Sequence, residues 1–162
     1  MTRPGVSVMA RRFGRTIPAL LLAACVIGGW TRSARAVTVK TLHIIGKDDD
    51  SGVDARIPAA VRAALKRTFH FKSYALAGSA ARGAAMGQTV RIALPGGHVL
   101  VVKPISATGE GTARRITLEV AVFKGSSRIV AVTVRLKPGR YWLLGGPPVD
   151  GGTLIVAIAV VE

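Results

Sequence analysis

The chain has 162 residues and a formal net charge of +15 at pH 7, because 23 residues are Lys or Arg and only eight are Asp or Glu. Cys25 is its only cysteine, which excludes an intramolecular disulfide framework. Aromatic residues make up only 5% of the chain, which argues against a base-stacking surface for nucleic acid, whereas apolar residues make up 49% and can build the core of one domain.

The first 36 residues have the pattern of a secretory signal peptide. Their basic head contains no acidic residue and four arginines: Arg3, Arg11, Arg12 and Arg15. An apolar run follows from Ile17 to Trp30, and the small residues Ala34 and Ala36 stand at the −3 and −1 positions before Val37. This order predicts that residues 1–36 are a cleaved signal peptide, so we expect an exported bacterial protein, periplasmic or secreted, that begins at Val37.

Two other interpretations of this segment stay open. The sequence Leu22-Ala23-Ala24-Cys25 matches the bacterial lipobox, and lipidation of Cys25 would make the protein a membrane-anchored lipoprotein. An uncleaved anchor is the least favoured alternative, because the apolar run has 14 residues and about 20 are needed to span a bilayer. We therefore expect no membrane span after processing.

Much of the positive charge belongs to the predicted signal peptide. Six of the 23 Lys and Arg residues lie in the first 36 residues, which leaves 17 against eight acidic residues and a net charge of +9 for residues 37–162. A basic exported domain favours anionic surroundings such as lipid head groups, acidic glycans or an acidic protein. The expected partner is an unidentified envelope protein or an anionic surface, and not nucleic acid, from which export separates the protein.

Residues 37–68 predict an opening β-loop-α unit. Val37 to Ile45 is typical of a strand, and the Asp- and Gly-rich residues 47–52 indicate a loop. A helix is expected from about Asp54 or Pro58 to Arg67, with Asp54 as a plausible N-cap. Its apolar stripe recurs every four residues: Ile57, Val61, Leu65 and Phe69. An extended return is expected after the helix, and the Ala- and Gly-rich segment 79–87 is expected to be a connection.

The rest of the chain predicts short strands joined by turns. Apolar and polar residues alternate in most of these segments, which run over residues 89–94, 99–103, 116–122, 130–136 and 141–144. Residues 95–97 indicate a hairpin turn, and residues 145–148 a Gly/Pro loop. The last segment, residues 154–161, is apolar on both faces and is expected to be a central strand.

These elements predict one mainly β domain over residues 37–162. The expected fold is a β-sandwich or small barrel of about 6–8 strands with one N-terminal amphipathic helix packed on it. Leu118 and Val132 should sit in its core, because each is a central apolar member of a clearly alternating run.

Several turn and core motifs together carry a resemblance. They are Gly52-Val53-Asp54 before the helix, Ser73-Tyr74 after it, Leu94-Pro95-Gly96-Gly97, and Gly145-Gly146-Pro147-Pro148 followed by Gly151-Gly152-Thr153-Leu154-Ile155. In this order they resemble a group of small exported bacterial β-rich proteins of unknown function. The resemblance covers most of the predicted mature chain and implies a shared fold rather than a chemistry.

The sequence predicts no catalytic residue, no cofactor and no metal site. The three histidines, His43, His70 and His98, lack metal-ligand spacing, and no nucleophile motif or phosphate loop is present. The acidic cluster of residues 48–50 with Asp54 lacks calcium-loop spacing and is interpreted as a solvated loop before a helix.

One candidate contact site stands beside the Gly/Pro segment. Tyr141 and Trp142 precede it directly, and Arg140 adds a positive charge. We therefore expect a non-catalytic exported β-domain that acts by binding, as an accessory or structural component of the cell envelope. The alternatives are a hydrolase of envelope polymers whose active site the sequence does not reveal, and a binder of anionic lipid or glycan.

Overall fold

The computed structural model describes residues 36–162, so residues 1–35 of the predicted signal peptide, Cys25 included, lie outside the described residues. The described elements, in chain order, are β1 (Ala36–Lys47), α1 (Ala59–Thr68), β2 (Ser73–Ala85), β3 (Val90–Leu94), β4 (His98–Thr108), β5 (Arg115–Lys124), β6 (Ser127–Leu136), β7 (Trp142–Val149) and β8 (Gly152–Val161). Short 3-10 turns occupy Pro95–Gly97 and Gly111–Ala113.

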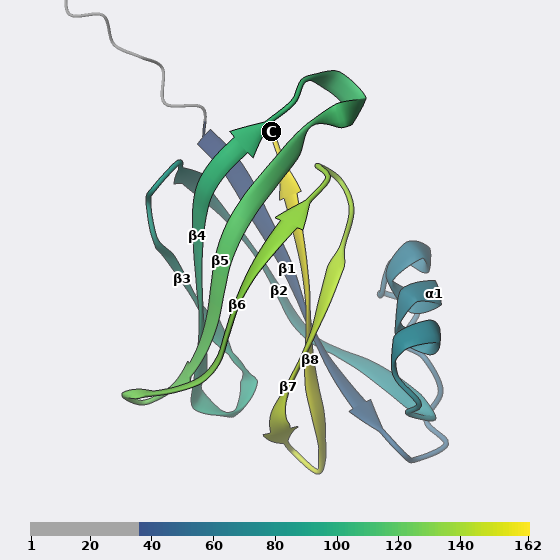
Figure 1. Cartoon of the computed structure of the whole chain (residues 1–162). Coiled ribbons are helices and arrows are strands. Elements are labelled where there is room, and N and C mark those ends of the chain that lie inside the picture. The colour runs from purple at the N-terminus through teal and green to yellow at the C-terminus, as the bar shows by residue number, and fades with distance from the viewer. Residues whose placement is uncertain (1–35) are drawn as a thin grey trace, which may run out of the picture. The chain divides into compact units, whose positions relative to one another are not determined.

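The strands form two antiparallel four-stranded sheets that pack face to face (Figure 1). The first sheet has the order β2-β1-β8-β7, and the second has the order β3-β4-β5-β6. Within residues 36–162 this gives eight strands and one α-helix, so the predicted β-sandwich with a single helix is confirmed.

The main core lies between the two sheets. Every second residue of β5 points into it and is almost fully shielded from solvent: Ile116, Leu118, Val120 and Val122. Leu118 is thus buried, as its place in the alternating run predicts. Val132 faces the same core from β6 but is only half-buried, because β6 is an edge strand and has a neighbour on one side only.

A second, smaller core lies between α1 and the outer face of the first sheet. Ile57 precedes the helix, and it joins Val61 and Leu65 in a buried stripe, which confirms the predicted apolar face. This stripe packs against Ile44 of β1 and Ile155 of β8. The helix therefore covers part of the first sheet on the side opposite the second sheet (Figure 1).

The N-terminus of α1 differs from the sequence-based expectation. The helix begins at Ala59 with Pro58 at the N-cap, where no side chain forms a capping hydrogen bond. The prediction that Asp54 is the N-cap is wrong. Its carboxylate accepts hydrogen bonds from the backbone N–H groups of Arg56 and Leu76 instead, because Asp54 lies five positions before the first helical residue, Ala59.

Two segments that were expected to be connections are parts of strands. Most of residues 79–87 belongs to β2, which pairs with β1 up to Ala85; this long-range pairing overrides the low β-propensity of Ala and Gly. The expected Gly/Pro loop, residues 145–148, lies within β7. Because β7 is an edge strand, prolines can be accommodated there, and its register with β8 shifts between Gly145 and Pro148.

The last strand has the central position that its composition predicts. β8 lies between β1 and β7 and is covered on both faces. Val156 points into the core between the sheets and Ile155 points into the core under α1, and both side chains are almost fully buried.

His43 is a polar residue within the sandwich. Its side chain is 6% exposed, and its register partner on β8, Val156, belongs to the main core. The ring nitrogen Nε2 lies 3.2 Å from Thr41 Oγ1, and that hydroxyl donates a hydrogen bond to the backbone carbonyl of Ala80 at 3.4 Å. Burial lowers the pKa of His43 below its ordinary value of 6.5, because a charged imidazolium loses its hydration there.

This burial predicts that the free energy of unfolding depends on pH. As the pH falls below about 6.5, His43 takes up a proton more readily in the unfolded chain than in the folded chain. Protonation therefore favours the unfolded state, and the stability that neutral His43 contributes above that pH is lost as the pH falls. We expect urea unfolding midpoints to be lower at pH 5.5 than at pH 8, and His43→Gln to reduce this difference. An unchanged difference in the variant would show that other groups cause the pH dependence.

Candidate binding surface

The outer face of the second sheet is open to solvent in the described part of the chain. The side chains of β3 to β6 that point away from the core are all exposed or half-buried, in contrast to the helix-covered part of the first sheet. Phe123, Val99 and Val101 are apolar side chains among them, and each is half-buried. An apolar surface of this kind is a candidate contact site, because isolated domains seldom leave large apolar patches uncovered.

The strand register places these side chains in two adjacent rows. One row runs across the four strands as Arg91, Val101, Ala121 and Ala131. The next row runs as Ala93, Val99, Phe123 and Arg128. Together the rows make an apolar floor with an arginine at one end of each, at opposite edges of the sheet.

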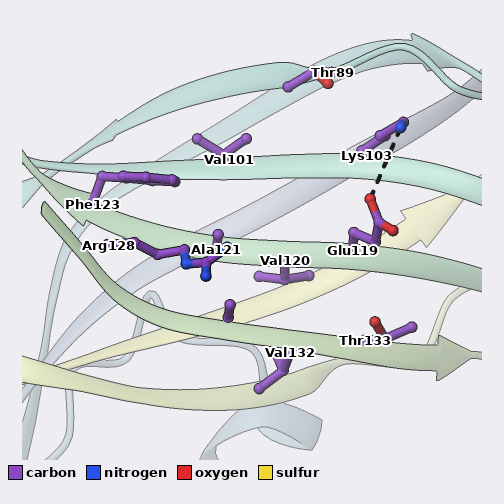
Figure 2. Close-up of a pocket in the computed structure, with 11 residues that line it drawn as sticks. Thr89, Val101, Lys103, Glu119, Val120, Ala121, Phe123, Arg128, Val132 and Thr133 are labelled. Carbon is purple, nitrogen blue, oxygen red and sulfur yellow. Dashed lines mark ion pairs between the residues drawn. The ribbon is translucent and has the colours of Figure 1, made fainter. Parts of the chain in front are cut away.

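A hollow of about 460 Å³ lies over this floor. Figure 2 shows its lining side chains, with Phe123 along the surface and the side chain of Arg128 extending toward Ala121. Its other polar lining residues are Thr89, Lys103, Glu119 and Thr133. Six of its eleven lining residues are apolar, and its volume lies in the range of sites for small ligands.

The charge on this face is mainly positive. The basic residues that point outward from the strands include Arg91, Lys103, Arg128 and Arg135. Among the described outward-pointing side chains of this sheet, the one acidic residue is Glu119. It forms an ion pair with Lys103 at 4.0 Å, and both side chains stay about half-exposed. Within residues 36–162 the three arginines form no ion pair, so the face attracts anionic groups.

The residues of the sequence-predicted contact site lie elsewhere, on and before β7. Trp142 packs against the core between the sheets, whereas Tyr141 packs against the core under α1. Arg140 is exposed. The two aromatic rings thus point to different cores and both are partly buried, and a contact role for this trio stays a prediction.

The histidines and acidic residues are dispersed or engaged in local structure. His98 Nδ1 lies 3.0 Å from the carbonyl of Pro95 in the β3–β4 turn, far in sequence from buried His43. Asp49 accepts hydrogen bonds from the Ser73 hydroxyl at 2.5 Å and from Ser51, which lower the pKa of its carboxyl group. Among the described residues no group of three or more His, Cys, Asp or Glu side chains is arranged to hold a metal ion.

The outer face of the second sheet is not apparent from the sequence. Its only signal is that residues 99–102 and 120–123 are apolar at consecutive positions, which gives their strands apolar side chains on both faces. Such a run does not reveal whether its second face is covered by another element or left open.

The fold and this surface define a β-sandwich domain with one sheet partly covered by a helix and the other open. No protein-family model, curated protein or solved structure matches the chain. The resemblance to small exported bacterial proteins therefore stays a prediction. Among residues 36–162, no helix has the length and apolar composition that crossing a membrane requires.

Proposed function

We propose that this chain is an exported, non-catalytic domain of the bacterial cell envelope that binds anionic amphiphilic molecules on the outer face of its second sheet. The observation that carries the proposal is the apolar floor with arginines at its edges. The corresponding face of the first sheet is sealed in part by α1, whereas this one has no cover among the described elements.

The chemistry of the surface supports a ligand with two parts. Contact with Val101 and Phe123 removes apolar surface from water, which favours an acyl chain or another apolar body. The guanidinium of Arg128 can pair with a phosphate or carboxylate at the end of that body. Anionic lipids of the envelope combine both parts, and the predicted signal peptide would bring the domain to them.

Co-sedimentation of the Val37–Glu162 protein with phosphatidylglycerol/phosphatidylcholine vesicles tests this function. We expect Arg128→Glu to lower the bound fraction several-fold at 0.1 M salt. The matched control is Arg67→Glu on α1, which makes the same charge change away from the surface and should have a much smaller effect. Equal losses in both variants would show that overall charge alone attracts the protein, which would contradict a defined site.

Salt separates the two parts of the interaction. The Debye length falls from about 10 Å at 0.1 M to about 3 Å at 1 M salt, so the electrostatic part should weaken over this range. The binding that persists at 1 M salt should depend on the apolar floor and be lost in Phe123→Ser. Hydrolysis of peptidoglycan fragments, or stoichiometric zinc or calcium in the purified protein, would contradict the non-catalytic proposal.

A further inference from the structure

The free edge of the first sheet, along β2, is closed at one end by the chain itself. The segment before α1 runs parallel to β2 there and bridges Val53 to Tyr74. The N–H of Tyr74 donates to the carbonyl of Gly52, and the N–H of Asp54 donates to the carbonyl of Tyr74, both at 2.9 Å. Residues 52–54 thus act as a short added strand.

The side chains of Asp54 and Arg56 bond the next pair of outward-pointing backbone groups on this edge, those of Leu76. The Asp54 carboxylate accepts the N–H of Leu76 at 3.3 Å, and the Arg56 guanidinium donates to the carbonyl of Leu76, also at 3.3 Å. An ion pair of 2.6 Å joins the two side chains. Hydrogen bonds from Arg56 hold the pKa of the Asp54 carboxyl well below its usual range, so this acceptor stays ionised at neutral pH.

Beyond Leu76 the same edge is open. Among the described strands β2 pairs in the sheet with β1 alone, and Ser79, Ala81 and Gly83 are exposed. The N–H of Ala85 turns away from β1 and donates to Gln88 Oε1. Alternate residues of a strand point their backbone groups the same way, so Ser79, Ala81 and Gly83 direct theirs outward, where no other described residue bonds to them.

The other edge strands carry features that oppose strand addition. β7 contains Pro147 and Pro148, β3 has five residues, and β6 carries Arg128 and Arg135 on the outer face. β2 has 13 residues, no proline and one charged side chain, that of Arg82. Edges of this length without such protection readily pair with another strand.

We propose that the β2 edge from Ser79 to Gly83 binds an extended, acidic peptide segment of another envelope protein by adding it as a fifth strand to the first sheet. The backbone groups of the edge supply the hydrogen bonds. Arg82 on the edge and Lys40, which pairs with Ala81 from β1, select negative charge in the incoming strand. A second copy of this chain is the poorer occupant, because it would bring its own Arg82 and a net charge of +9 to the same edge.

The test uses an array of eight-residue peptides that alternate Val and Thr and carry either two Glu or two Lys residues. We expect the Val37–Glu162 protein to bind the Glu peptides at least about tenfold more tightly than the Lys peptides. Ala81→Pro removes a backbone donor that the fold does not use, so it should keep the circular dichroism spectrum and weaken Glu-peptide binding about tenfold or more. Arg82→Glu should reverse the charge preference.

Hydrogen exchange locates the added strand. The amides of Ser79, Ala81 and Gly83 should exchange rapidly in the free protein and slow down on addition of a Glu peptide. Equal binding of Glu and Lys peptides, or unchanged binding by a folded Ala81→Pro, would overturn the proposal. Protection of these amides that grows with protein concentration in the absence of peptide would identify a second copy as the occupant instead. Ala81→Pro should leave vesicle binding unchanged, which separates this site from the surface of the second sheet.

Discussion

Leu118→Ala is expected to lower the free energy of unfolding by about 2–5 kcal/mol, the usual cost of truncating a fully buried leucine. Leu118 has no exposed surface and lies in the middle of β5, where Pro104 of β4 and Val134 of β6 are its register partners. Both neighbouring strands hold the backbone in place, so the cavity that the substitution leaves cannot easily collapse. Urea unfolding at neutral pH measures the change.

The matched control for this substitution is Val101→Ala in the neighbouring strand. Val101 belongs to the same sheet, but its half-buried side chain points to the outer face. We expect its truncation to change the free energy of unfolding by much less, because the lost atoms contact solvent in the folded protein. Equal effects at Leu118 and Val101 would mean that the assigned inner and outer faces of the second sheet are wrong.

Gly96→Ala is expected to destabilise the protein by about 2–5 kcal/mol. Gly96 lies in the turn between β3 and β4 with a φ of +72°, which costs an L-residue about 1–2 kcal/mol. A Cβ atom there would also overlap Cγ1 of Val149, a buried residue at the end of β7, and overpacking of this kind adds about 1–3 kcal/mol. Position 96 therefore requires glycine for two independent reasons, its positive φ and the contact with Val149.

Gly97→Ala is the control in the same turn. Gly97 has a φ of +71°, almost the same as Gly96, but no atom lies within 4 Å of the position its Cβ would take. Only the backbone cost of about 1–2 kcal/mol should therefore appear. The difference between the two urea midpoints measures the contact between the β3–β4 turn and β7. If the two variants were equally stable, this contact would contribute nothing to the fold.

Local pattern was sufficient for most of the secondary structure. The two-residue period of β5 predicts which of its side chains are buried, and the apolar stripe that recurs every four residues through Val61 and Leu65 predicts the buried side of α1. Both predictions succeed because each element packs one of its faces against a core, so the buried positions follow the periodicity of the backbone. Asp54 shows the limit of this reasoning, since its carboxylate binds Leu76, a residue 22 positions away.

The candidate binding surfaces were not predictable in the same way. The sequence favours Tyr141 and Trp142, because aromatic residues beside glycines and prolines can form contact sites, but both rings are partly packed against core clusters. Phe123 and Val101 come together only through the register of β4 with β5. The open edge at Ala81 likewise depends on the absence of a described neighbour beyond β2, which no local pattern encodes.

The sequence by itself determined a mainly β domain with one amphipathic helix, a central final strand and a strongly basic surface, because alternation, helical periodicity and charge are properties of neighbouring residues. Only the tertiary structure decided that residues 79–85 form a strand. It also decided that, within residues 36–162, no element covers the apolar outer face of the second sheet or pairs with the β2 edge from Ser79 to Gly83. These features arise from pairing and packing between distant segments, in which the hydrogen bonds of β1 outweigh the weak β-propensity of Ala and Gly.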